Sequence, residues 1–269
     1  MHFRAQQPPP QPSYQYSRRV NILGIGISAV DMPDALKFLT GCIHDRAKIY
    51  VNVCPVYTLM QGVEHPELKQ ILNQAGMVTP DGMPLVVLSR LKGYRNVGRV
   101  YGPDLLLALS EIMAEHRLAS FYLGGAEGVP ERLADELRGR YPALKVAGTF
   151  SPPFRALTPV EEDEIAAMIN EAAPDVVWVG LGSPKQDYWM ANYRERLDAP
   201  LLIGVGAAFD FLTGRLPQAP RWMQRLALEW LFRLINEPHR LWRRYLIYNP
   251  WFLWKVFLQE SGLKRYPLD

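Results

Sequence analysis

Short apolar runs alternate with segments of helical periodicity along the first 214 residues of the chain. The runs expected to form strands are 20–27, 49–53, 77–82, 120–125, 145–150, 175–182 and 200–209. The segments expected to form helices are 33–45, 56–75, 103–116, 130–141, 159–173 and 185–197. Apolar runs without polar alternation, such as 175–182, are typical of parallel sheets that helices cover on both faces. The pattern predicts an α/β domain, a Rossmann-like parallel sheet with helices on both faces, over residues 19–214.

After Gly214 the pattern changes to helices alone. Pro220, Pro238 and Pro250 each stand where we expect a helix to open, since proline is favoured in a first helical turn. Residues 215–269 contain ten Lys or Arg against four Asp or Glu, so they carry +6 while the whole chain carries +3. Five of the seven Trp also lie there. Arginine together with tryptophan suits a surface that meets anionic phosphate and an apolar phase at once, as a membrane interface does.

Composition narrows the class of protein. A chain with 48% hydrophobic and 21% charged residues is ordinary for a globular protein, and no run of 18 apolar residues predicts a transmembrane helix. Residues 1–18 have no apolar signal-peptide region and are rich in proline and glutamine, so we expect a disordered leader. Two cysteines imply no disulfide framework and fit a reducing cytoplasm. The basic charge is confined to the end of the chain and no nucleic-acid motif accompanies it, so we expect no nucleic-acid partner.

Two glycine-rich strand ends give weak signals. Gly24 and Gly26 lack the third glycine of a dinucleotide fingerprint, because position 29 is Ala, so NAD binding is disfavoured. Gly124 and Gly125 stand between a strand and a helix. Their N–H groups suit a diphosphate at a helix N-terminus, and they suit a plain turn equally well.

The segment 180–187 carries a stronger signal. It follows the most apolar strand and opens a helix, and ligands of such sheets lie beyond the carboxyl ends of the strands. Gly182 lets a ligand approach the backbone, Pro184 fixes the entry to the helix, Lys185 offers a cation, and Gln186 offers an amide. This density of polar groups favours a nucleotide-sugar site over a simple turn.

Asp81 and Asp210 also follow strand runs. Either residue could cap a turn or act as a general base, and the residues alone leave both roles open. No Asp-x-Asp motif is present and the five His are scattered, so we expect no metal. A leaving diphosphate would then require cationic side chains to stabilise its charge.

Six segments in order resemble one family. They are TPDGMPLV (79–86), RVYGPDLL (99–106), FYLGG (121–125), VGLGSPKQDYWM (179–190), GVGAAFDFLTG (204–214) and the arginine-rich stretch 219–246. Together they resemble the WecG/TagA/CpsF glycosyltransferases (glycosyltransferase family 26). The resemblance implies a Rossmann-like core with a helical C-terminal appendage (GT-E type).

The resemblance also implies an activity. It is metal-independent, inverting transfer of an N-acetylmannosamine-type or glucose-type sugar from a UDP-sugar to a polyprenyl-diphosphate-linked sugar, in the synthesis of bacterial cell-surface polysaccharide. The enzyme would be cytoplasmic and peripheral on the inner face of the membrane, with no cofactor. Residues 215–269 would associate with the membrane and complete the active site.

By the same resemblance, individual positions take roles. Asp81 matches the catalytic base and Arg99 an active-site arginine, while Gln186 and Asp210 match polar groups near the donor. The tail arginines that match contacts to the diphosphate are Arg233, Arg240 and Arg243. Asn52 stands where the family often has Thr, and Cys54 stands where it usually has Asn, at positions that would contact the donor or acceptor sugar.

Three alternatives follow from the residues themselves. The first is a dehydrogenase or other Rossmann-type nucleotide enzyme, which would need a complete glycine fingerprint. The second is a non-enzymatic membrane-binding module, which would leave the polar strand ends without a task. The third concerns residues 215–269, whose Trp, Leu and Phe side chains also suit the interface of a homo-oligomer.

Overall fold

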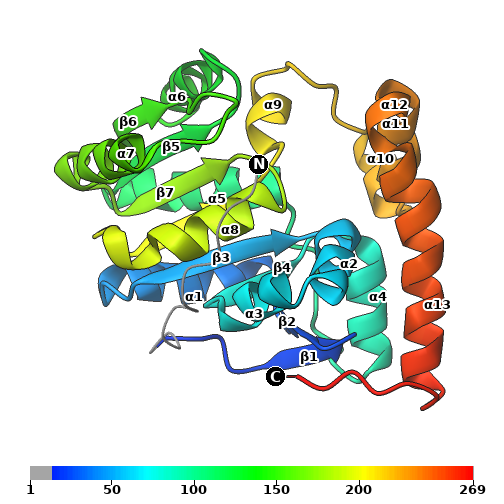
Figure 1. Ribbon diagram of the computed structural model, residues 1–269. Helices are drawn as coiled ribbons and strands as arrows, with labels where there is room; N and C mark the ends of the chain where they lie inside the picture. The colour runs from blue at the N-terminus through cyan, green and yellow to red at the C-terminus, as the bar shows by residue number, and fades with distance from the viewer. Residues whose placement is uncertain (1–13, 269) are drawn as a thin grey trace.

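A computed structural model describes residues 14–268, in which six parallel strands form the central sheet (Figure 1). The strands are β3 (Ile49–Cys54), β4 (Met77–Pro80), β5 (Ala119–Gly124), β6 (Lys145–Phe150), β7 (Val176–Gly180) and β8 (Leu201–Gly204). Their order across the sheet is β4-β3-β8-β7-β5-β6, and every neighbouring pair is parallel. All six carboxyl ends therefore meet at one edge of the sheet. The predicted α/β class is confirmed.

Helices cover both faces of this sheet. One face packs against α1 (Met32–His44), α5 (Gly102–Glu115), α6 (Val129–Arg140) and α9 (Ala208–Leu212). The other packs against α2 (Val56–Glu64), α3 (Pro66–Gln74), α4 (Met83–Leu91), α7 (Pro159–Ala172) and α8 (Lys185–Tyr193). In β7, Val176 and Trp178 enter the first core, and Val177 and Val179 enter the second. A strand with two dry faces needs an apolar residue at every position, which explains the unbroken run in the sequence.

The expected strand 20–27 is wrong. The chain instead forms an antiparallel hairpin of β1 (Arg19–Ile22) and β2 (Ile25–Ser28), with both turn residues, Leu23 and Gly24, at positive φ. A two-residue turn with positive φ at both positions matches the right-handed twist of the strands that it joins. The first turn residue, Leu23, is apolar and buried in the core, so the sequence lacks the polar residue that usually indicates a turn.

Other expected segments are divided in the structure. The region 56–75 forms two helices, because Pro66 has no N–H to continue the first and opens the second. The expected strand 200–209 ends at Gly204, and its last residues begin α9. Helix α4 was not predicted, and a short 3₁₀ turn, η1 (Arg194–Arg196), follows α8.

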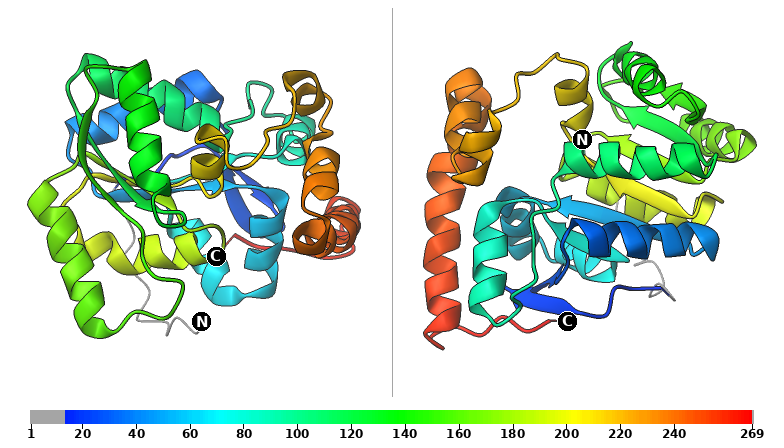
Figure 2. Two further views of the ribbon diagram at one scale, coloured as in Figure 1. Left: turned by 90° about the horizontal axis from the view of Figure 1, so that it is seen from above. Right: turned by 180° about the vertical axis from the view of Figure 1, so that it is seen from behind.

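Beyond α9 the chain leaves the sheet and forms only helices. They are α10 (Arg221–Arg225), α11 (Glu229–Asn236), α12 (Pro238–Trp242), the π-helical turn η2 (Arg243–Ile247) and α13 (Tyr248–Glu260). The first three stand beyond the carboxyl edge of the sheet, and α13 runs down the side of the molecule next to α4 (Figures 1 and 2). Pro250 lies in the first turn of α13, and the π-helical turn η2 comes directly before that helix. Proline has no N–H to donate to the preceding turn, and the wider turn of η2 accommodates this loss, so the chain is helical on both sides of the proline.

The expected disordered leader, 1–18, lies mostly outside the described residues. Of its last five residues, Tyr16 donates its N–H to the Gly76 carbonyl, and Gln15 donates its side-chain amide to the Asn73 carbonyl. Within residues 14–268, no helix has the length and apolarity needed to cross a membrane.

Candidate active site

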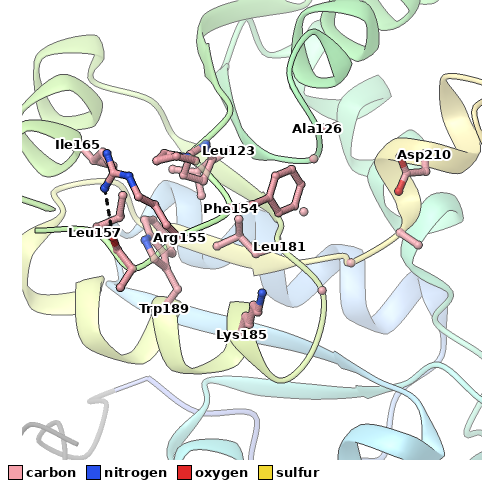
Figure 3. Close-up of a pocket in the computed structure, with 18 of the residues that line it drawn as sticks. Leu123, Ala126, Phe154, Arg155, Leu157, Ile165, Leu181, Lys185, Trp189 and Asp210 are labelled. Atoms are coloured by element: carbon pink, nitrogen blue, oxygen red, sulfur yellow. Dashed lines mark hydrogen bonds between the residues drawn. The ribbon is translucent and has the colours of Figure 1, made fainter. Parts of the chain in front are cut away.

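Two cavities open at the carboxyl edge of the sheet, between the core and the helices that follow it. The first has a volume of about 710 Å³ and lies among the loops after β5, β6 and β7 (Figure 3). The second, of about 520 Å³, lies between the ends of β3 and β4 and the helices α11 and η2. Gly182, Gly206, Ala207 and Arg240 line both cavities, so the two are neighbouring parts of one site.

The first cavity has an apolar wall and a charged mouth. Leu123, Leu157, Ile165, Leu181 and Trp189 form part of the apolar wall. Lys185, Asp210, Arg215, Glu237 and Arg240 contribute the charged groups. Figure 3 shows that Lys185 and Asp210 come from different elements, α8 and α9. Such a lining suits a ligand with a flat, weakly polar part and an anionic part.

The segment 151–158 covers one side of the first cavity and was not predicted as part of the site. Arg155 donates to the carboxylate of Glu161 at 2.7 Å, and Thr158 forms a capping box with the same glutamate at the start of α7. These contacts anchor the segment and leave Phe154 at the cavity rim, 85% exposed. The only signal in the sequence is an aromatic residue directly after two prolines.

The glycines after β5 are placed by packing. A Cβ on Gly124 would lie 2.6 Å from the carbonyl carbon of Gly180, so only glycine fits this approach of two strand ends. Gly125 lines the first cavity, and its N–H is donated to the Gly180 carbonyl at 3.0 Å. This geometry forms a turn, and the diphosphate contact expected of these glycines stays a prediction.

The segment 180–187 lies between the two cavities. Gly182 adopts φ +75° and lines both, while Lys185 is exposed and lines the first. Pro184, whose preceding peptide bond is cis, caps α8. Gln186 is buried, and its Oε1 accepts the N–H of Gly206 at 2.9 Å. The Gln186 amide thus ties the loop after β7 to the loop after β8, and it lines the second cavity.

Asn52 and Cys54 are both fully buried in β3 and line neither cavity. Asn52 donates to Asp187 at 2.6 Å, and the Cys54 thiol lies near the carboxylates of Asp187 and Asp81. Burial raises the pKa of the Cys54 thiol well above its usual value, and it raises the pKa of Asp187 to about 6. The two residues lie behind the cavity wall, because β3 is covered on both faces, and the sugar contact implied for them stays a prediction.

Asp81 lies at the end of β4 and faces the second cavity. Its side chain is 19% exposed, while its Oδ1 is buried and has no hydrogen-bond partner among residues 14–268. Burial raises the pKa of Asp81, the charge of Glu229 raises it further, and the charge of Arg99 opposes both. A carboxylate at a cavity wall that accepts no hydrogen bond from the described residues and has a raised pKa is suited to accept a proton from a hydroxyl group.

Arg99 contacts Asp81 mainly through the backbone. Its Nε donates to the Asp81 carbonyl at 2.5 Å, and its guanidinium stacks on the ring of Tyr101, 4.1 Å from the centroid. One terminal nitrogen of Arg99 lies 2.5 Å from the Glu229 carboxylate, which belongs to α11. Glu229 was not predicted as a site residue. Its signal in the sequence is that it is the only acidic residue between Arg215 and Asn236.

The predicted tail arginines occupy different places in the site. The Arg233 side chain is only 13% exposed, lies over the Phe211 ring and lines the second cavity. Arg240 is more exposed and pairs with Glu237 at 2.5 Å at the junction of the two cavities. Arg243 also lines the second cavity.

Arg244, which was not predicted, lies deeper than Arg243. Its guanidinium lies 4.8 Å from the centre of the Tyr57 ring, and its charge acts on Asp81 together with that of Arg233. Burial lowers the pKa of Arg244. Among the described residues, Arg244 forms no ion pair with a carboxylate, so its charge is available to an anion in the second cavity.

Asp210 lines the first cavity. Asp210 comes from α9, and its Oδ1 lies 3.5 Å from Arg215. No group of three or more His, Cys, Asp or Glu within residues 14–268 is arranged to hold a metal ion. That the reaction needs no metal stays a prediction.

Comparison with known proteins identifies the family. The sequence model of the WecG/TagA/CpsF glycosyl transferase family matches residues 20–266. The chain belongs to this family. As a member, it is a sugar-transferring enzyme, which sets aside both the dehydrogenase and the non-enzymatic module.

Two relatives share the name N-acetylglucosaminyldiphosphoundecaprenol N-acetyl-beta-D-mannosaminyltransferase. The protein of Bacillus subtilis (strain 168) is 33% identical over 196 residues, which cover 73% of this chain and 74% of the relative. The protein of Bacillus spizizenii (strain W23) is 30% identical over 186 residues, which cover 69% of this chain and 70% of the relative.

Proposed function

We propose that this glycosyltransferase moves a sugar from a UDP-sugar to a polyprenyl-diphosphate-linked sugar, with inversion and without a metal, at the cytoplasmic face of the membrane. The observation that carries the proposal is the Asp81 carboxylate, which lines the second cavity, accepts no hydrogen bond from the described residues and has arginines around it. The names of the two relatives favour an N-acetylmannosamine-type donor over a glucose-type donor, and an N-acetylglucosamine diphosphate lipid as acceptor.

The first cavity suits the UDP-sugar. Its volume of about 710 Å³ lies within the range of small-molecule sites, and its apolar wall can cover a nucleobase. Lys185, Arg215 and Arg240 supply positive charge at the mouth for the diphosphate. The sugar would then reach the junction of the two cavities near Gly182 and Gly206.

The second cavity suits the acceptor. Asp81 removes the proton from the acceptor hydroxyl group. The hydroxyl oxygen of the acceptor attacks the anomeric carbon of the donor sugar, and the bond from that carbon to the UDP oxygen breaks. A single displacement of this kind inverts the anomeric configuration. Arg233 and Arg244 line the same cavity and supply positive charge for the lipid diphosphate. Fixed cations of this kind stabilise developing charge in the way a metal otherwise does.

The surface of the appendage supports a place at the membrane. We use "the appendage" for residues 215–268, the described part of the predicted tail. Its exposed large apolar side chains are Trp222, Leu226, Trp230, Leu231, Ile235, Trp242, Leu246, Ile247, Trp251, Leu253, Trp254, Phe257, Leu263 and Leu268. Helices with exposed Trp, Leu and Phe beside arginines bind the boundary between headgroups and acyl chains. An enzyme bound there would meet a lipid-linked acceptor directly.

The test of the base is Asp81→Asn with UDP release measured from UDP-N-acetylmannosamine and a lipid-linked N-acetylglucosamine acceptor. We expect a loss of about 10²- to 10⁴-fold in kcat, the usual contribution of a general base. Asp135→Asn, at an exposed carboxylate of α6, is the matched control and should leave kcat unchanged. Near-wild-type turnover by the Asp81 variant would contradict the assignment.

A UDP-sugar panel tests the donor separately. N-acetylmannosamine should give the fastest UDP release, and a preference for UDP-glucose would change the donor while leaving the base assignment intact.

A further inference from the structure

An ion pair joins the appendage to the core next to Asp81. Glu229, the first residue of α11, places its Oε2 2.5 Å from a terminal nitrogen of Arg99. Both side chains are largely buried, with 14% of Glu229 and 18% of Arg99 exposed. Burying an ion pair removes both charges from water, which costs free energy, so such a pair is a weak source of stability. Its position beside the proposed base suggests a role in the reaction instead.

Arg99 has its hydrogen-bonding groups divided between two directions. Its Nε donates to the backbone carbonyl of Asp81, and a terminal nitrogen donates to Glu229. The same terminal nitrogen lies 3.8 Å from Oδ1 of Asp81, which is too far for a hydrogen bond. Arg99 therefore fixes the backbone of Asp81 while leaving its carboxylate without a direct bond.

We propose that Glu229 is a positioning residue for the reaction: it holds the Arg99 guanidinium toward the appendage and so keeps the Asp81 carboxylate free to take the acceptor proton. This inference rests on the proposed function, in which Asp81 is the base. Without the Glu229 carboxylate, Arg99 would need to close only from 3.8 Å to about 2.8 Å to form a charge-assisted bond with Asp81. That bond would stabilise the charged form of the Asp81 carboxylate, so Asp81 would take up the acceptor proton less readily.

The charges around Asp81 act in the same direction. Arg99 precedes α5, Arg233 lies on α11 and Arg244 on η2, and all three lower the pKa of Asp81. Glu229 is the acidic group among these neighbours, and its charge raises that pKa. The Cys54 thiol of β3 also faces Asp81, but its own raised pKa keeps it neutral. Removing the Glu229 charge leaves the three arginines unopposed, which lowers the pKa of Asp81 and weakens it as a base.

The experiment is Glu229→Gln in the full chain, with kcat and KM measured across pH. We expect the acid limb of kcat to move about one unit toward lower pH and the plateau to fall about 10-fold, because a weaker base accepts a proton less readily. The KM for the UDP-sugar should stay at the wild-type value, since Glu229 does not line the first cavity. Glu229→Asp keeps the charge and should return the acid limb toward its wild-type position.

Arg221→Gln is the matched control. Arg221 pairs with Asp104 at 2.8 Å across the same interface, and it lines neither cavity. If Glu229 only docked the appendage, both variants would lose rate to a similar extent with an unmoved acid limb, and that result would overturn the inference. Thermal melts of each variant show whether the fold is retained, and Glu229→Asp serves if the glutamine variant does not fold.

Asp81→Asn separates this inference from the proposed function. Turnover by Asp81→Asn would remove the base and the proposed function with it. An inactive Asp81→Asn beside a Glu229→Gln enzyme with a wild-type acid limb would contradict the role of Glu229 alone.

Discussion

The core and the appendage differ in what they bury. Strand β7 has four residues with no measurable exposure, and its apolar side chains pack in two cores. No residue of helix α11 is fully buried, and its apolar residues Trp230, Leu231 and Ile235 are exposed. Both regions are apolar in sequence, but the core uses that character for its own packing while the appendage presents it to the outside.

Several of the contacts that hold the appendage are polar. They include Arg221 with Asp104, Glu229 with Arg99, Tyr248 with Gln61 and Glu64, and Lys92 with Glu260. Apolar contacts add to them, since Phe252 of α13 is buried in the core and Tyr248, Val256 and Tyr266 pack against it. An attachment of this kind orients charged groups over the cavities and contributes less to stability than the packed sheet does. The core therefore supplies the fold, and the appendage supplies much of the charge in the site.

Removal of residues 215–269 should give the largest effect. We expect a core that still melts cooperatively and transfers sugar at least about 10³-fold more slowly, because the arginines around the diphosphate are lost. Circular dichroism melts and UDP release measure the two parts. Sugar transfer by the truncated protein at the rate of the full chain would show that the whole site lies in the core.

Within the appendage, Arg244→Gln should have the next largest effect. Loss of a charge-assisted contact costs about 1.5–3 kcal/mol, so kcat/KM for the lipid acceptor should fall about 10- to 100-fold. Arg265→Gln, at an exposed arginine outside both cavities, is the control. Equal kinetics for the two variants would show that charge in the appendage acts by number and not by position.

Replacement of exposed apolar groups should weaken membrane binding while sparing chemistry. Trp254 is 56% exposed on α13, so Trp254→Ser should reduce partition into anionic liposomes several-fold, from about 1 kcal/mol of lost burial. Phe154→Ser, at an exposed aromatic residue of the core, should leave partition unchanged. Light scattering in the same samples tests the homo-oligomer, because an oligomer that dissociates in Trp254→Ser would assign this face to a second copy of the chain.

The smallest effect should come from Asp187, inside the core. Its pKa of about 6 lies above its ordinary value of 3.8, so the folded state binds the proton more tightly than the unfolded chain. This contribution to stability is present at low pH and is lost as pH rises toward 6. Asp187→Asn should therefore gain a few degrees in Tm over wild type at pH 7.5, and less at pH 4.5. A gain that did not vary with pH would contradict the buried charge, and Asp135→Asn should show no pH-dependent gain.

The sequence was informative wherever structure follows from local periodicity. The order of strands and helices from residue 49 to 200 agrees closely with the prediction, since a strand buried on both faces and an amphipathic helix have different apolar periods. The hairpin at 19–28 was missed because its turn residue Leu23 is buried, so the apolar run hides the change of direction. Helix α4 was missed as well.

The sequence by itself determined the α/β alternation, the polar residues at the strand ends and the basic, tryptophan-rich composition of residues 215–269. Only the tertiary structure decided which charges meet. Arg99 and Glu229 lie 130 residues apart, and Asn52 and Asp187 lie 135 apart. Periodicity reports how one segment faces its own surroundings, whereas an ion pair depends on where two separately formed segments pack. For that reason the sequence contained the proposed base at Asp81, and the fold was needed to find the carboxylate that keeps it free.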